Sequence, residues 1–237
     1  MKASLIIIGN EILSGRTQDK NLSYLATWLN EIGIQLSEVR VIRDEEEEII
    51  DTVNFLRKKY DYVFTTGGIG PTHDDITSES IAKAFNVDLE INPQALAILK
   101  EYYKDSELTE ARLKMTKMPK GAVLVENPVS KAPGFKIENV FVMAGIPKIM
   151  QGMLEGAKIH LSGGKPMKSE SIDVFMPESF IAEELSNLQD KFRDVEIGSY
   201  PFVRDGKYGT SLVIRSSDSK KLFDCKAQME LMIGKLV

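Results

Sequence analysis

The chain has 237 residues, enough for one large domain or two small ones, and 43% of them are hydrophobic, as in an ordinary globular protein. Its net charge of −5 argues against general nucleic-acid binding, which needs a basic surface. No apolar segment approaches membrane-spanning length, and the apolar run at the N-terminus is too short for a signal peptide. A single cysteine, Cys225, excludes an intrachain disulfide and is typical of a reducing compartment. We therefore expect a cytoplasmic protein that binds small molecules and neither nucleic acid nor a membrane.

Strand-like and helix-like patterns alternate along the first 162 residues. Strands are expected at residues 5–8, 36–42, 62–65, 123–125, 135–137 and 140–143, and helices at 21–32, 45–59, 77–85, 93–103 and 147–160. Such alternation predicts an α/β fold class, with a three-layer, mostly parallel sheet that carries helices on both faces.

A glycine-containing linker, Ser162 to Pro166, ends this pattern. After it we expect strands at 171–176, 195–200 and 211–215 and helices at 178–192 and 219–236. The prediction is therefore two domains, residues 1–162 and residues 166–237, of which the second is a small α+β domain.

One expected strand-to-helix turn, Thr66 to Thr77, combines three glycines, three hydroxyls and the adjacent carboxylates of Asp74 and Asp75. Glycines allow the backbone to approach a ligand closely, and the N–H groups at a helix N-terminus favour a phosphate-like anion. Carboxylates hold hard divalent cations, which in turn bridge phosphates. The turn is therefore predicted to be a phosphate and metal site.

Four separated segments resemble the molybdopterin-binding (MoaB/Mog-like) domain family. They are Gly9 to Gly15 with Asp19 to Asn21 just beyond, Thr66 to Thr77, Asn127 to Phe135, and Ala144 to Pro147. The versions they resemble most are the N-terminal region of the competence/damage-inducible protein CinA and the N-terminal domain of eukaryotic FAD synthases. Residues 166–237 resemble the small domain that follows in CinA-type proteins. The segments that carry this resemblance are Glu196 to Pro201 and Tyr208 to Thr210.

The resemblance implies a phosphate or diphosphate ligand at the Thr66 to Thr77 turn, and a homo-oligomer, with a dimer favoured. Mog-type members bind molybdopterin and adenylylate it. CinA-type domains resemble metal-dependent pyrophosphatases of ADP-ribose, and the FAD synthase version is similar to an FAD hydrolase. The paired Asp74 and Asp75 indicate the CinA and FAD synthase branch of the family, since Mog-type members usually carry one aspartate there. Three residues depart from the common pattern: Asn10, Lys131 and Ala144.

The candidate site residues form three overlapping sets. The expected catalytic residues are Asp75, Asp74 and Asp44, and the expected ligands of a divalent metal (Mg, Mn or Co) are Asp75, Asp74 and Glu11. The expected ligand-binding residues are Gly9, Glu11, Ser14, Asn21, Thr66, Gly67, Gly68, Gly70, Thr72, Thr77, Pro133 and Gly134. Several have a structural alternative: a helix N-cap for Asp75 and Asp44, a helix-dipole partner for Asp74, and a surface position for Glu11. Thr66, Ser14 and Asn21 could instead cap turns, and Pro133 and Gly134 could form an ordinary turn before a strand.

Three functions of different classes fit these residues. The first is a metal-dependent hydrolase that cleaves a nucleotide diphosphate, of the ADP-ribose or FAD type, to AMP and a second phosphate product. The second is a protein of molybdenum cofactor biosynthesis that binds or adenylylates molybdopterin. The third is a binding module without chemistry. The Asp74 and Asp75 pair favours the first, because two negative charges help to bind a phosphate only when a metal is present.

Overall fold

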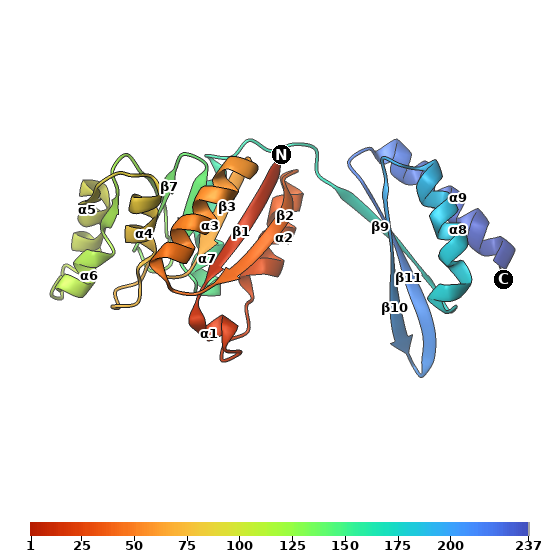
Figure 1. Ribbon diagram of the computed structural model, residues 1–237, viewed down its shortest axis with the longest axis horizontal. Helices are drawn as coiled ribbons and strands as arrows, with labels where there is room; N and C mark the ends of the chain where they lie inside the picture. Colours follow the sequence, from red (N-terminus) through yellow and green to blue (C-terminus); the bar gives the residue numbers. More distant parts are fainter. Residues whose placement is uncertain (237) are drawn as a thin grey trace. The chain divides into compact units, whose positions relative to one another are not determined.

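The computed structural model describes residues 1–236, and the chain divides after Gly164 into two compact units (Figure 1). The first unit is built on one six-stranded sheet in the order β2-β1-β3-β8-β7-β6. Its strands are β1 (Lys2–Ile8), β2 (Gln35–Ile42), β3 (Tyr62–Thr66), β6 (Val123–Val125), β7 (Gly134–Ile137) and β8 (Val140–Met143). Strands β2, β1, β3 and β8 pair in parallel, and β7 runs antiparallel to both of its neighbours.

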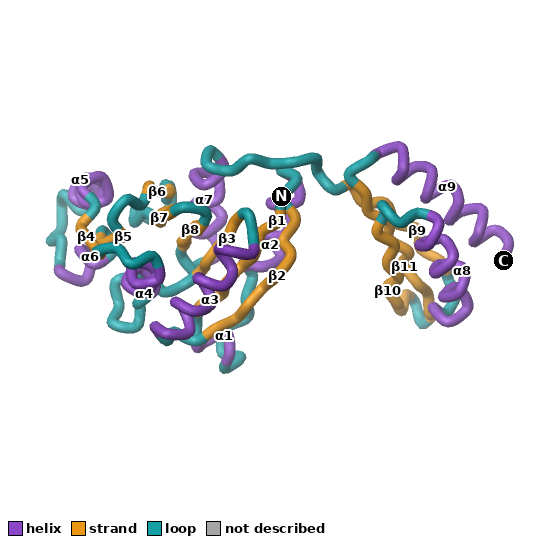
Figure 2. The backbone as a smooth tube through the Cα atoms, turned by 45° about the horizontal axis from the view of Figure 1, so that its top comes forward, coloured by secondary structure: helices purple, strands orange, loops and turns teal. Residues whose placement is uncertain are grey.

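Helices cover both faces of this sheet (Figure 2). The helices of the first unit are α1 (Asn10–Leu13), α2 (Asn21–Glu31), α3 (Glu46–Lys59), α4 (Thr77–Ala84), α5 (Pro93–Tyr102), α6 (Glu110–Lys114) and α7 (Pro147–Lys158). Apolar residues of α2 and α7 pack on one face, and those of α3, α4 and α5 pack on the other. The predicted three-layer α/β fold is thereby confirmed.

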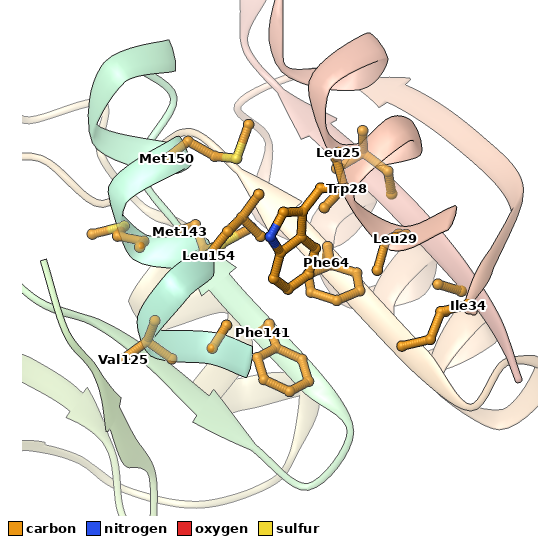
Figure 3. Packing of buried hydrophobic residues seen from close by; sticks show 14 of the residues in the cluster. Leu25, Trp28, Leu29, Ile34, Phe64, Val125, Phe141, Met143, Met150 and Leu154 are labelled. Atoms are coloured by element: carbon orange, nitrogen blue, oxygen red, sulfur yellow. The ribbon is translucent and has the colours of Figure 1, made fainter. Parts of the chain in front are cut away.

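The two faces are filled because successive residues of a strand point to opposite sides. On the α2 and α7 face, the Phe64 and Phe141 rings stack with centroids 5.0 Å apart (Figure 3). Trp28 of α2 reaches into the same cluster, and its indole N–H donates to Glu155 at 3.3 Å. Alternate residues such as Val63 and Val142 belong to the opposite core.

Several short elements of the first unit were not expected from the sequence. They are α1, α6, and the two-stranded sheet of β4 (Leu89–Ile91) and β5 (Lys117–Pro119). Each has five residues or fewer, too few to show a helical or alternating pattern, and none is a continuous apolar run like the equally short β6 and β8.

The second unit has the order β9 (Lys168–Val174), α8 (Glu178–Lys191), β10 (Glu196–Arg204), β11 (Lys207–Ser216) and α9 (Ser219–Leu236). Its antiparallel sheet has the order β10-β11-β9, and both helices contribute to one apolar cluster with it. This arrangement confirms the predicted small α+β region. The β10–β11 hairpin is longer than expected, with a turn at Asp205 and Gly206, whose φ values of 52° and 73° suit a two-residue hairpin loop.

The start of the predicted linker, residues 162–164, packs against the first unit. The Ser162 N–H donates to the Tyr62 hydroxyl at 2.9 Å, and the Gly164 N–H donates to the Ile32 carbonyl at 3.1 Å. A side chain at Gly163 would come within 2.1 Å of that same carbonyl oxygen, so the segment needs a glycine to lie so close to it. Within residues 1–236, no helix is long and apolar enough to cross a membrane.

Candidate functional site

The candidate site lies where parallel strands of the central sheet end. The segments after β1, β2, β3 and β8 all contribute residues to one cavity of about 600 Å³. In doubly wound sheets the ligand binds outside the carboxyl ends of the strands, at the point where the chain reverses its direction of winding. Here the chain passes from β1 to β2 on one side and then to β3 on the other, so β1 and β3 flank that point.

The turn after β3 owes its shape to two glycines in the left-handed region. Gly67 and Gly68 have φ values of 106° and 67°. A Cβ on Gly67 would lie 2.1 Å from the Ile8 carbonyl oxygen, and one on Gly68 would lie 2.1 Å from the Thr77 hydroxyl. The Gly67 N–H donates to the Met143 carbonyl at 3.1 Å, which ties the turn to the end of β8. No other residue type could occupy these two positions without displacing neighbouring strands or α4.

Asp75 shapes the far end of this turn and borders the cavity. Its Oδ2 accepts hydrogen bonds from the Thr72 N–H at 2.8 Å and the Thr72 hydroxyl at 2.5 Å. Gly70 permits this position, since a Cβ there would lie 2.6 Å from the same carboxylate oxygen. Ile76, not Asp75, occupies the N-cap position of α4, and no side chain caps that helix. Asp75 therefore does not act as a helix cap.

Asp74 also lines the cavity, with its side chain 66% exposed. Its pKa lies below the ordinary value, chiefly because of the neighbouring Thr72 side chain, and the nearby His73 and Lys114 lower it further. His73 itself is fully exposed, with Nδ1 3.9 Å from Asp74 Oδ1. Asp74 is therefore held as a carboxylate that is open to solvent.

Two further carboxylates reach the cavity from the ends of β1 and β2. Asp44 Oδ2 accepts the Asn10 N–H at 2.8 Å and so joins the loop after β2 to the first turn of α1. Glu45, without a side-chain cap bond, occupies the N-cap position of α3, so Asp44 does not cap the helix of the glutamate run. Glu11 of α1 lies against Gly9, where a Cβ would come within 2.5 Å of the Glu11 carboxylate. Four acidic side chains thus surround one cavity.

A smaller hollow of about 60 Å³ shares Glu11 with this cavity and contains Asn21 and Thr66. The Asn21 amide donates to the Gly145 carbonyl at 2.8 Å. Its Oδ1 and the Thr66 hydroxyl are buried and have no hydrogen-bond partner. Since buried polar atoms are normally satisfied, these two positions are suited to an ordered water or a polar group of a ligand.

The cavity therefore brings together most of the residues that the sequence indicated. Glu11, Asp44, Gly67, Gly68, Gly70, Thr72, Asp74 and Asp75 line the main cavity, and Asn21 and Thr66 line the hollow.

Five other candidates do not line either space, and the structure gives them packing contacts. Gly9 donates its N–H to the Ile42 carbonyl at 3.1 Å, and the Ser14 hydroxyl donates to the Glu11 carbonyl at 3.2 Å. Thr77 is fully buried beneath the glycine turn. Pro133 and Gly134 are buried at the start of β7, where a Cβ on Gly134 would lie 2.3 Å from the Val142 carbonyl oxygen.

Some residues at the cavity were missed. Asn127 and Ser130 line it, and they were visible in the Asn127 to Phe135 motif without being chosen. Asn127 is 5% exposed, and its side chain forms four hydrogen bonds within residues 129–132, so it shapes that loop. Lys114 of α6 also reaches the turn, where its Nζ donates to the Thr72 carbonyl. Nothing in the local sequence indicated that contact, because 42 residues separate the two.

The donor set suits a hard cation only in part. Oxygen ligands from carboxylates are what Mg²⁺ and similar ions prefer. Within residues 1–236, however, no three acidic, histidine or cysteine side chains come close enough to hold a metal by themselves. Mg²⁺ often binds through one or two carboxylates together with the phosphates of its substrate. The carboxylates of the cavity therefore fit a cation that is held partly by the protein and partly by a phosphate ligand. They do not fit a cation that is coordinated by protein side chains alone.

The fold and the site define a doubly wound α/β domain with a glycine turn and carboxylates at the carboxyl ends of its strands, which is the edge where such folds bind their ligands. Residues 4–161 match the family described as "Probable molybdopterin binding domain", and the chain belongs to this family. Residues 166–237 match the family described as "FAD synthase, middle domain". The family resemblance seen in the sequence motifs is thereby confirmed.

Relatives share both the sequence and the fold. A protein of Sulfurisphaera tokodaii is 38% identical over 210 residues, which cover 84% of this chain and 80% of the relative. A protein of Archaeoglobus fulgidus is 36% identical over 201 residues, which cover 85% of this chain and 86% of the relative. The crystal structure of CinA from Thermoplasma acidophilum, a protein titled as of unknown function, superposes with a TM-score of 0.63 at 37% identity, covering 67% of this chain and 96% of that one.

Proposed function

We propose that this protein binds a phosphorylated cofactor or nucleotide in the cavity at the Gly67 to Asp75 turn, together with a divalent cation. Molybdopterin is the ligand that the family's description names, so a pterin phosphate is the first candidate. The observation that carries the proposal is the convergence of four strand ends, two left-handed glycines and four carboxylates on one cavity of about 600 Å³.

The phosphate would lie against the backbone of the turn. The N–H groups of Gly68, Ile69 and Gly70 are the donors proposed for its oxygens, since Gly67 already donates to the Met143 carbonyl. Gly68 allows the turn to lie directly on Thr77, and Gly70 leaves room for the Asp75 carboxylate, so glycines at both positions permit this backbone course.

A cation is needed because the cavity is acidic. Glu11, Asp44, Asp74 and Asp75 line it, and within residues 1–236 its lining contains no lysine or arginine. A phosphate placed there without a cation would be repelled. Asp75 and Asp74 are the proposed ligands of a Mg²⁺, Mn²⁺ or Co²⁺ ion that is shared with the phosphate. Glu11 also lines the cavity, but within residues 1–236 no three such side chains are close enough to hold one ion together, so its expected role as a third ligand is not part of the proposal.

The same acidic lining favours a second candidate, the cleavage of a nucleotide diphosphate such as ADP-ribose or FAD to AMP and a second phosphate product. A divalent cation, when bound, neutralises the diphosphate and activates a water. The chain's own residues would orient the diphosphate against the turn and, through Asp75 and Asp44, hold the attacking water on one side of the phosphorus. The match of the second unit to a domain of FAD synthase supports a nucleotide ligand.

One experiment separates these candidates. Purified protein is incubated with ADP-ribose, FAD or ATP and each of Mg²⁺, Mn²⁺ and Co²⁺, and AMP is measured. A parallel titration with molybdopterin measures binding. AMP release supports cleavage; molybdopterin binding without AMP release supports the pterin candidate. Failure to bind any of these ligands, with or without metal, overturns the proposal.

A further inference from the structure

A second cavity lies on the other side of Asp75. It has a volume of about 550 Å³ and shares Ile69, Gly70 and Asp75 with the main cavity. Its remaining walls come from α4, β4 and the segment that carries α6 and β5, namely Ser78, Glu79, Leu89, Ile91, Glu110, Leu113, Lys114 and Lys117. The two cavities therefore meet at the turn that is proposed to hold a phosphate.

The charges of the two cavities differ. The lining of the main cavity contains acidic side chains and, within residues 1–236, no lysine or arginine, whereas the second cavity combines Lys114 and Lys117 with the carboxylates of Asp75, Glu79 and Glu110. Among residues 1–236, neither lysine forms an ion pair within 4 Å. Glu79, on the same wall, is paired with Lys83 at 3.3 Å. The cationic groups that can face a ligand phosphate thus lie beyond Asp75.

Lys114 is held at the boundary between the cavities. It is the last residue of α6, and its Nζ donates to the carbonyl of Thr72, which lies three residues before Asp75. An ammonium group has three N–H donors, so two remain for a ligand. The next residue, Met115, already belongs to the wall of the main cavity.

We propose that the second cavity is a subsite for the second, phosphate-bearing half of a ligand whose diphosphate crosses the turn at Gly70 and Asp75. The first half, a nucleoside monophosphate, lies in the main cavity, where Met115, Ile146 and Ile149 offer apolar walls for a base. Lys114 is a substrate-binding residue that contacts the second phosphate, and Lys117 lines the same cavity. This inference rests on the proposed function and extends it to ligands with two organic halves.

The test uses the two halves of ADP-ribose as separate probes. AMP and ribose 5-phosphate are each titrated into the full chain with Mg²⁺, by calorimetry. Lys114→Met keeps an unbranched side chain and removes the charge, Lys114→Arg keeps a charge, and Lys120→Met removes an exposed lysine that does not line either cavity. Circular dichroism confirms that each variant is folded.

In the unmutated protein both probes are expected to bind at once. Lys114→Met should weaken ribose 5-phosphate by about tenfold or more, the usual effect of losing one charge-assisted hydrogen bond. It should change AMP binding by less than about twofold, the effect expected for a residue outside the AMP cavity. Lys114→Arg should restore most of the ribose 5-phosphate affinity, and Lys120→Met should affect neither probe.

The other outcomes separate the subsite from the proposed function. If AMP binds and ribose 5-phosphate does not, or if Lys114→Met weakens the binding of AMP instead, the proposed subsite is wrong. The proposed nucleotide site in the main cavity is then retained. If ribose 5-phosphate binds in a Lys114-dependent way and AMP does not bind, the nucleotide site proposed for the main cavity is wrong and the subsite is retained. If neither probe binds, both are overturned.

Discussion

The hydroxyl of Thr77 donates to the carbonyl of Gly67 at 3.0 Å, across ten residues of chain. The Thr77 N–H donates to the Gly68 carbonyl at 2.9 Å, so one buried threonine closes the glycine turn from below with two bonds. Thr77 was predicted from the sequence to contact the ligand. In the structure it lies beneath the turn, where it fixes the direction of the two carbonyls.

Replacing Thr77 by valine should therefore affect both stability and binding. Valine keeps the volume and removes the hydroxyl, which leaves the Gly67 carbonyl without that donor and should lower the free energy of unfolding by about 1–3 kcal/mol. Ligand affinity should fall as well, because the turn loses a fixed contact. Denaturant unfolding and calorimetric titration measure the two effects. Thr77→Ser is the matched control, and a Thr77→Val protein as stable as Thr77→Ser would contradict the assigned bond.

Gly68→Ala should be more damaging than an ordinary glycine replacement. Gly68 and Gly121 both have positive φ, at 67° and 83°. A Cβ on Gly68 would lie 2.1 Å from the Thr77 hydroxyl, whereas one on Gly121 would have nothing within 4 Å. Gly121→Ala should cost about 1 kcal/mol of backbone strain, and Gly68→Ala about 1–3 kcal/mol more because of overpacking. Equal losses in thermal unfolding would show that the turn relaxes freely.

The sequence predicted the large elements and much of the site because both depend on local patterns. Long apolar strands and amphipathic helices have enough residues to show their periods, and glycines next to paired aspartates identify a turn by composition. It did not predict α6 or the β4–β5 sheet, whose pairing joins Leu89 to Pro119 across the chain. Lys114 was missed for the same reason, since only the tertiary fold brings α6 to Thr72.

The packing roles of other candidates also depend on distant contacts. Gly134 was predicted to be a ligand-binding residue, and the structure places it in β7, close to the Val142 carbonyl of β8. Asp44 was weighed as a cap for the following helix, yet it accepts a hydrogen bond from Asn10, 34 residues earlier. Neither partner can be identified from residue spacing. The roles of these residues toward a ligand remain predictions.

Glu38 should make stability depend on acidic pH. Hydrogen bonds from Lys59 and Tyr60, at 2.6 and 2.8 Å, and from Arg40 lower the pKa of this carboxyl from 4.5 to about 2. The folded state therefore holds its proton less tightly than the unfolded state does. The resulting stability is complete above pH 4.5 and is lost as the pH falls toward about 2.

Glu38→Gln removes this contribution while keeping the shape of the side chain. The variant should be less stable than the unmutated protein at pH 6, and the two should converge as the pH falls through that window. Urea unfolding at a series of pH values measures both curves. Parallel curves, with a constant difference from pH 6 to pH 2.5, would show that Glu38 is not the group responsible.

The first unit should fold by itself and form the homodimer that the family resemblance implies. Residues 1–164 contain two complete apolar clusters, so a fragment of that length should unfold cooperatively. Family resemblance leads us to expect that it forms a homodimer, as the full chain should. Circular dichroism and light scattering of both proteins check this. A fragment without a cooperative transition would contradict independent folding, and monomer masses at micromolar concentration would contradict the dimer.

Asp75 is the residue on which the proposed function depends most. Asp75→Asn keeps an oxygen that can accept from Thr72 and removes the charge that would hold a divalent cation. Loss of about 1 kcal/mol in the Thr72 interaction should lower the melting temperature by only about 2–4 °C. Ligand binding, by contrast, should be lost wherever it requires the metal.

Calorimetric titration of ADP-ribose into the unmutated protein and Asp75→Asn, with and without Mg²⁺, tests the account most directly. We predict binding to the unmutated protein that requires Mg²⁺, and an affinity at least about tenfold weaker in the folded variant, as expected when a charged partner is removed from a metal and phosphate site. Equal affinities of the two proteins in the presence of Mg²⁺ would contradict the proposal that Asp75 and a cation hold the ligand at the glycine turn.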